Sequence, residues 1–178
     1  MLKILVIDIE TKPHTGYVWQ LFNQNISLSQ LKETGGTICF AAKWLGDDEI
    51  IFKSDWHGSH RAMIKAAHKL LDTADAIVHY NGTKFDIPML NKEFIKLGLA
   101  PPAPHKNIDL YREVKRNFKF ASNKLDHVAE QLGLGKKTAH TGFKLWLDVL
   151  AREPEALDLM EEYNKQDVIL TEKVYYKV

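Results

Sequence analysis

Two carboxylates, Asp8 and Glu10, end a largely apolar stretch that begins at Leu2. This composition is typical of a strand buried between two layers. Because side chains alternate along a strand, both carboxylates lie on one face, about 7 Å apart. Two buried like charges repel each other unless a cation lies between them, so a bound metal ion is the natural candidate. For this pair alone, a strand that simply ends in two acids is an equally good explanation.

Two further acids stand where an ordinary surface acid is not expected. Asp86 follows a short strand, a loop and an aromatic residue, in the run from His79 to Asp86. In the last helix, Tyr163 and Asp167 are four residues apart and therefore share one face. The apolar residues Leu170 and Val174 continue that face, so Asp167 belongs to a stripe that a helix normally turns toward a sheet.

Each of these acids has a simple explanation when it is taken alone. Asp86 suits a helix N-cap, Asp167 an exposed position on a terminal helix, and Tyr163 a core aromatic with its hydroxyl at the rim. Their coincidence with Asp8 and Glu10 favours a common site. Four converging carboxylates suit hard divalent cations, and two such ions stabilise the attacking and leaving oxygens of a phosphoryl displacement.

The composition is that of one ordinary globular domain over residues 1–178. The net charge is +1, so any contact with nucleic acid must come from a local basic patch. The single cysteine, Cys39, lies in an apolar run, is expected to be buried and fits a reducing compartment. The apolar start is too short for a membrane span, and no signal peptide is expected. We therefore expect a cytoplasmic protein, in a prokaryote or in the host cell of a virus, with no membrane partner.

Strands are expected early in the chain and helices late, an order that indicates an α/β fold. Gly46-Asp47-Asp48 predicts a hairpin between its two flanking strands. We expect Asp86 to cap a helix with a buried stripe, and Ser122 to open another helix. Residues 17–31 have no clear assignment. The expected strands are 37–45, 49–53, 76–80 and 107–109, and the expected helices are 60–73, 86–97, 110–118, 122–132, 143–151 and 154–175.

Three segments together resemble a known family. They are Asp8-Ile9-Glu10-Thr11, Asn81 through Phe85-Asp86, and Tyr163-Asn164-Lys165-Gln166-Asp167. They resemble the three motifs of the DEDD, or DnaQ-like, 3′–5′ exonucleases, and the tyrosine indicates the tyrosine subclass. Residues 80–90 and 122–129 resemble the proofreading domain of family B DNA polymerases in particular. Residues 17–36 have no evident counterpart there.

This resemblance implies a ribonuclease H-like fold, with a mixed central sheet flanked by helices. It also implies two divalent ions, Mg²⁺ or Mn²⁺. Asp8 would bridge the ions, Glu10 and Asp167 would hold the tighter one, and Asp86 would hold the second directly or through water. Tyr163 would orient the attacking water, because a phenol with a pKa near 10 is a poor base at neutral pH.

Substrate contacts are expected from two groups of residues. By the resemblance, Asn81 and Phe85 line the groove near the terminal nucleotides, although Phe85 suits the core equally well. The densest basic run of the chain contains one acid, Glu113, and we interpret it as a strip that follows the phosphate backbone, with Lys136 and Lys137 as candidate additions. The strip comprises Arg112, Lys115, Arg116, Lys119 and Lys124.

The expected function is metal-dependent removal of nucleotides from the 3′ end of single-stranded DNA. Two alternatives remain: an exoribonuclease of the same family, and a catalytically weak nucleic-acid-binding or structural module of a larger replication or repair complex. All four ligand positions are filled, which argues against the second alternative. A separate polymerase or a replication or repair protein is the expected protein partner.

Overall fold

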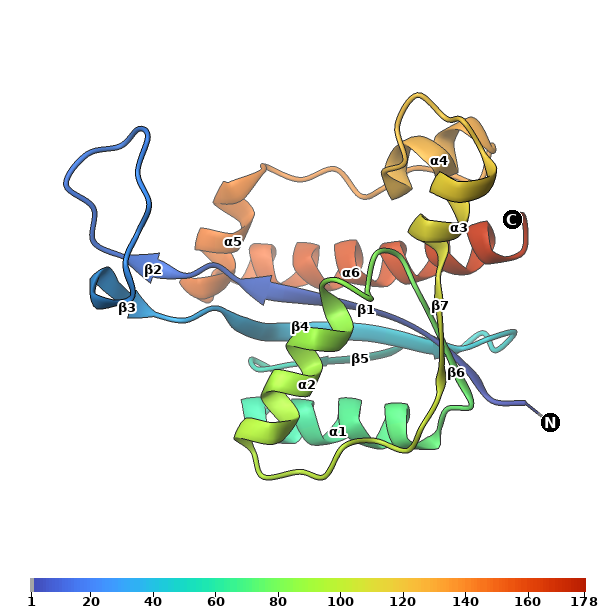
Figure 1. Cartoon of the computed structure of the whole chain (residues 1–178), viewed down its shortest axis with the longest axis horizontal. Coiled ribbons are helices and arrows are strands. Elements are labelled where there is room, and N and C mark those ends of the chain that lie inside the picture. The colour runs from blue at the N-terminus through green and yellow to red at the C-terminus, as the bar shows by residue number, and fades with distance from the viewer. Residues whose placement is uncertain (1) are drawn as a thin grey trace.

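The computed structural model describes residues 2–178, and its centre is a five-stranded mixed sheet (Figure 1). The strand order is β5-β4-β1-β6-β7. Central strand β1 pairs antiparallel with β4 and parallel with β6. The strands are β1 (Ile4–Lys12), β4 (Gly36–Trp44), β5 (Ile51–Ser54), β6 (Ala76–His79) and β7 (Lys106–Asp109). The expected mixed sheet is confirmed.

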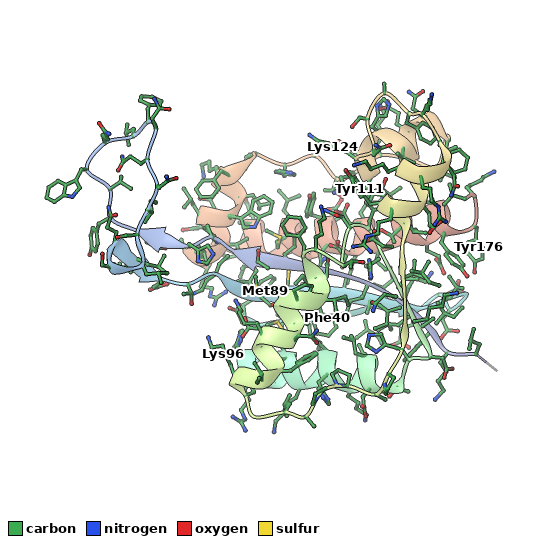
Figure 2. All side chains as sticks on the ribbon, viewed as in Figure 1. Phe40, Met89, Lys96, Tyr111, Lys124 and Tyr176 are labelled. Carbon is green, nitrogen blue, oxygen red and sulfur yellow. The ribbon has the colours of Figure 1, made fainter. Side chains whose placement is uncertain are left out.

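Helices cover both faces of the sheet because β1 and β4 are apolar on both sides (Figures 1 and 2). Ile7 packs with Phe40 toward α1 (His60–Thr73) and α2 (Asp86–Lys96). Val6 faces the other way and packs with Ala41 toward α6 (Pro154–Tyr175). The same layer as α6 contains α3 (Leu110–Asn117), α4 (Leu125–Gln131) and α5 (Phe143–Leu150).

Three local predictions are wrong. Asp86 is not an N-cap: it is the first residue of α2, and the capping position is Phe85. The helix expected from Ser122 begins at Leu125, and the Ser122 hydroxyl accepts a hydrogen bond from the Lys124 amide. The helix expected over 110–118 ends at Asn117, so Phe118 lies one residue beyond it, and its side chain is 40% exposed.

The segment without a sequence assignment forms a small hairpin beyond the end of the main sheet (Figure 1). Its arms are β2 (Thr15–Gly16) and β3 (Leu31–Glu33), and the short 3₁₀ helix η1 (Leu28–Gln30) lies directly before β3. Cys39 is buried, as expected. Within residues 2–178, no helix combines the length and the hydropathy needed to cross a membrane.

Candidate active site

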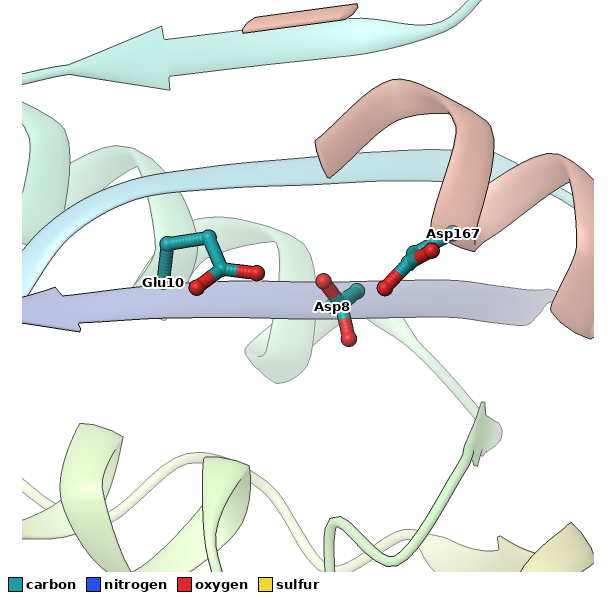
Figure 3. A group of neighbouring side chains, drawn as sticks. All are labelled: Asp8, Glu10 and Asp167. Atoms are coloured by element: carbon teal, nitrogen blue, oxygen red, sulfur yellow. The ribbon is translucent and has the colours of Figure 1, made fainter. Parts of the chain in front are cut away.

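The first strand and the last helix bring three carboxylates together. Asp8 and Glu10 leave β1 on the face that α6 covers, opposite Ala41 and Cys39 of β4. Asp167 reaches them from the middle of α6. One carboxylate oxygen of each acid lies within 4.8 Å of one oxygen of the other two (Figure 3). The alternation of the strand and the face of the helix therefore predicted this convergence correctly.

Asp86 lies at the edge of this cluster but outside that triangle of oxygens. Its Oδ1 accepts a hydrogen bond of 3.0 Å from the amide of Ile9, the residue between Asp8 and Glu10. Strand β6 pairs with β1 only as far as Val6, so the Ile9 amide has no strand partner on that side. The carboxylate that the sequence assigns to a helix cap thus replaces a missing strand neighbour and is held beside the other acids.

One cation already lies in the cluster, and the sequence analysis did not place it there. The Lys137 ammonium is 2.5 Å from Asp167 Oδ2 and 3.3 Å from the Tyr163 hydroxyl. The sequence made Lys137 only a candidate addition to the phosphate-binding strip. Nothing in its local sequence shows that the loop folds back over α6, 30 residues later in the chain.

Asn164 is a second residue that the sequence analysis did not assign to the site. Its side-chain amide donates to Asp8 Oδ2 at 2.7 Å and to the Asp8 carbonyl at 3.2 Å. The side chain is fully buried, so these bonds hold the first strand against the last helix. The three-residue spacing from Asn164 to Asp167 puts both side chains on one helical face, and this signal was available in the sequence.

Burial makes ionisation of these acids unfavourable when no metal is bound. It raises the pKa of Asp8 well above the ordinary value, and Asp167, Asp86 and Glu10 add to the effect. Burial and then Asp167 raise the pKa of Glu10 to about 8. Burial raises the pKa of Asp86 to about 6, although the Ile9 amide opposes the shift. Burial also raises the pKa of Asp167, against the effect of Lys137.

Tyr163 stands beside the carboxylates with its ring held by other aromatic rings. His140 and Trp146 pack edge-on against it, with ring centroids 5.0 and 6.1 Å away. Burial and the neighbouring Asp167 raise the pKa of the Tyr163 hydroxyl to about 12. The hydroxyl therefore keeps its proton at neutral pH and acts as a hydrogen-bonding group, not as a base.

A cavity of about 370 Å³ opens onto Asp8, Tyr163 and Asp167. Of the expected substrate contacts, Asn81 and Lys124 line this cavity. Asn81 takes a left-handed conformation with φ 64°, which asparagine tolerates better than most residues. Its backbone amide donates a hydrogen bond to the Asp109 carboxylate. Phe85 is exposed rather than part of the core, and it precedes α2 at the residue next to Asp86.

The other residues of the basic strip lie on or after α3, outside the cavity lining. Arg112 pairs with Asp109 at 3.8 Å, and Arg116 pairs with Glu113 on its own helix. Lys119 is exposed in the connection that follows α3. Both arginines of the strip therefore already have an acidic neighbour, which reduces the positive field that the sequence suggested.

The donor set fits divalent cations. Carboxylate oxygens are the ligands that Mg²⁺ and Mn²⁺ prefer, and the three acids offer them at short mutual range. Asp167 Oδ1 is buried and has no hydrogen-bond partner among the described residues. A buried carboxylate oxygen without a partner is costly, and a metal ion at this point would satisfy it.

Comparisons with known proteins agree with this fold. The family B DNA polymerase of the hyperthermophilic archaeon Pyrobaculum calidifontis has a similar structure, with a TM-score of 0.74 and 20% sequence identity. The match covers 99% of this chain but only 24% of the polymerase chain, so it shows likeness of fold alone. No curated protein matches the sequence. Residues 5–178 match the RNase H superfamily, and the chain therefore belongs to that superfamily.

Proposed function

We propose that this protein is a metal-dependent 3′–5′ exonuclease that removes nucleotides from the 3′ end of single-stranded DNA. The observation that carries the proposal is the partly buried group of Asp8, Glu10 and Asp167, in which Asp167 Oδ1 has no hydrogen-bond partner among the described residues. Membership of a superfamily of hydrolytic nucleases supports phosphodiester cleavage as the chemistry.

Asp8, Glu10 and Asp167 are the residues that would hold divalent cations, with Asp86 at the edge of the set. Such ions, when bound, lower the pKa of a water molecule and neutralise the charge that develops on the phosphate. The chain's own residues position the carboxylates and the attacking water. Asn164 fixes the Asp8 carboxylate, and the Tyr163 hydroxyl, held by its aromatic neighbours, orients the water for attack in line with the leaving oxygen.

A terminal nucleotide suits the cavity better than an internal one. The cavity measures about 370 Å³ and is lined by Tyr163 and Asp167 of α6 and by Lys137, a volume that suits a small group rather than a continuous duplex. A paired terminus must fray before it enters. We therefore propose release of mononucleotides from the 3′ end of an unpaired strand, with Asn81 and Lys124 near the terminal nucleotides.

The test is degradation of end-labelled single- and double-stranded DNA and RNA in Mg²⁺ or Mn²⁺, read as a product ladder. A 5′-labelled DNA strand should give a ladder that shortens step by step, and cleavage should stop in excess EDTA. Faster degradation of RNA would assign the chain to the exoribonucleases instead. Preferred nicking of circular single strands would contradict the exonuclease proposal.

A further inference from the structure

The loop at residues 17–30, between β2 and β3, exposes large apolar side chains instead of burying them. Trp19 is 96% exposed, Phe22 79% and Tyr17 69%. Leu21, Ile26 and Leu28 are exposed as well. The loop rises beyond the end of the sheet, on the side where α5 and α6 lie, and no helix or strand of residues 2–178 covers it (Figures 1 and 2). An exposed group of this kind commonly marks a binding surface.

The base of the loop is fastened by hydrogen bonds, which hold the two ends of its apolar segment together. The Tyr17 amide donates to the Gln30 carbonyl at 2.9 Å, and the Gln30 side chain donates to the Tyr17 carbonyl at 2.9 Å. The Ser27 amide donates to Gln30 Oε1 at 3.1 Å. A loop that is ordered before it binds loses less conformational freedom when a ligand arrives.

The charge pattern of the segment fits a polyanion. Residues 11–32 contain no Asp or Glu, although the chain has 23 acidic residues. Lys12, which pairs with Glu33 at 3.2 Å, and Lys32 stand at the two ends of this acid-free stretch. The remaining polar residues of the loop are amides and hydroxyls, which neither repel phosphate nor require an ionic partner. The stretch is therefore a surface that a phosphodiester chain approaches without repulsion from acids of the loop.

The loop also continues the strand that carries the acids. Glu10 and Gly16 are six residues apart, so the base of the loop lies at most about 20 Å from Glu10 along the chain. That span corresponds to about six stacked nucleotides at about 3.4 Å each. A single strand whose 3′ end lies at the carboxylates is long enough to reach the loop once it exceeds about six nucleotides.

We propose that loop 17–30 is a stacking platform for the unpaired nucleic-acid strand, with the Trp19 ring as its principal contact and the Phe22 and Tyr17 rings beside it. This inference rests on the proposed nuclease function. Every base offers a flat face to an aromatic ring, so the platform takes a single strand of any sequence. Its contribution is apolar and does not depend on the ionic contacts of the basic strip.

Two substitutions at one position separate stacking from general hydrophobic contact. Trp19→Phe keeps a flat ring, whereas Trp19→Leu keeps apolar character without one. Binding of a fluorescent 12-nucleotide strand and of a trinucleotide is measured by anisotropy in EDTA, so that nothing is cleaved. Trp19→Leu should raise the Kd of the 12-mer about tenfold and leave that of the trinucleotide unchanged, whereas Trp19→Phe should stay within about threefold of the wild type.

Three further measurements make the test decisive. Ile95→Ala removes an exposed apolar side chain from α2 and should change neither Kd. The dependence of log K on log salt should keep its slope in Trp19→Leu, because stacking releases no counterions. Binding of the 12-mer should quench tryptophan emission in the wild type much more than in Trp19→Phe.

Equal Kd values for the wild type and Trp19→Leu would overturn the proposal, as would equal losses in Trp19→Leu and Trp19→Phe. Sedimentation velocity tests the alternative that the loop binds another protein chain. Concentration-dependent association that Trp19→Leu abolishes, with oligonucleotide binding unchanged, would make the loop a protein contact and overturn the proposal. Because no cleavage is measured, failure here is distinct from failure of the proposed exonuclease activity.

Discussion

The carboxylate site and loop 17–30 follow one another along the chain, yet they break opposite rules of protein structure. Asp8 and Glu10 put acids into an enclosed site, where charge is unfavourable. A few residues later, Trp19 and Phe22 put large apolar rings into water. Buried charge calls for a cation, and exposed aromatic surface calls for a flat or apolar partner. Together the two regions suit the ligand proposed above, a nucleic-acid strand with its divalent cations.

The two regions also differ in how the rest of the fold supports them. Asn164, Lys137 and the Ile9 amide each contact a carboxylate of the site, so its geometry is fixed from three separate segments. The loop is fastened only at its own base, through Tyr17 and Gln30. Chemistry depends on positions held to a fraction of an ångström, whereas stacking tolerates small displacements. Substitutions in the site should therefore act on turnover, and substitutions in the loop on affinity.

The largest effect is expected at the acids. Asp8→Ala, Asp86→Ala and Asp167→Ala should each lower kcat by about 1,000-fold or more, equivalent to about 4 kcal/mol of transition-state stabilisation. The fold should persist, because each change removes a charge from a self-repelling group. Asp158→Ala, an exposed acid on the same helix as Asp167, is the control and should be fully active. Turnover that survives in any of the three variants, or in excess EDTA, would separate the acids from the chemistry.

Tyr163→Phe tests whether position alone matters in the site. It removes the hydroxyl but keeps the ring that packs against His140 and Trp146. The loss of one orienting hydrogen bond should lower kcat by about 10- to 1,000-fold and leave KM nearly unchanged. The pH profile should keep its shape, because a hydroxyl with a pKa of about 12 does not titrate in the working range. Full activity would reduce Tyr163 to a packing residue.

A third region, the basic strip, sharpens the contrast with the loop. Neutralising Arg112, Arg116 and Lys119 together by glutamine should raise KM for long strands about tenfold and leave dinucleotides and kcat little changed. Each lost phosphate contact should flatten the log–log salt dependence of binding by about 0.7. The matched control removes three exposed cations from α1, on the other face of the sheet: Arg61, Lys65 and Lys69 to glutamine. An unchanged salt slope would place the strand elsewhere.

The parts of this fold that the sequence predicts are those that depend on short repeating patterns. Strand alternation places Asp8 and Glu10 on one face, and helical spacing aligns Tyr163 with Asp167. Asp86 was misassigned because the local pattern suits a cap, whereas its actual partner, the Ile9 amide, lies 77 residues earlier. Lys137 was not assigned to the carboxylate site for the same reason, since its loop lies against α6 only in the folded chain.

The exposure of the loop could not be predicted, because apolar residues in a sequence are ordinarily interpreted as buried. The apolar residues from Tyr17 to Leu28 would ordinarily indicate part of a core. They stay exposed because β2 and β3 carry them beyond the end of the sheet, where no other element of the described chain packs against them (Figure 1). The absence of any acid between residues 11 and 32 was visible in the sequence, but it has meaning only once the loop is seen to stand free.

The smallest expected effect concerns stability without metal, and its sign follows from the raised pKa of Glu10. In the folded protein this pKa is about 8, against an ordinary value of 4.5. Between these values the folded state holds a proton that the unfolded state has released. The stabilisation is therefore complete below pH 4.5 and is lost as the pH rises through 8. Asp86, with a pKa of about 6, acts in the same direction over a narrower range.

In EDTA, the Tm of the wild type should accordingly fall between pH 5 and pH 9. Glu10→Gln removes the group that must ionise, so its Tm should exceed that of the wild type by about 3–8 °C at pH 9 and be close to it at pH 5. Glu155→Gln, an exposed acid in the first turn of α6, should show no such difference.

Saturating Mg²⁺ should reverse the order of the two Tm values at pH 9, because the wild type gains a ligand that Glu10→Gln binds more weakly. A wild-type Tm that rises between pH 5 and pH 9 in EDTA would contradict the expected fall, because it would mean that the folded chain stabilises the ionised form of these acids. Loop variants such as Trp19→Leu should leave both curves unchanged, since their contacts form only when a strand is bound.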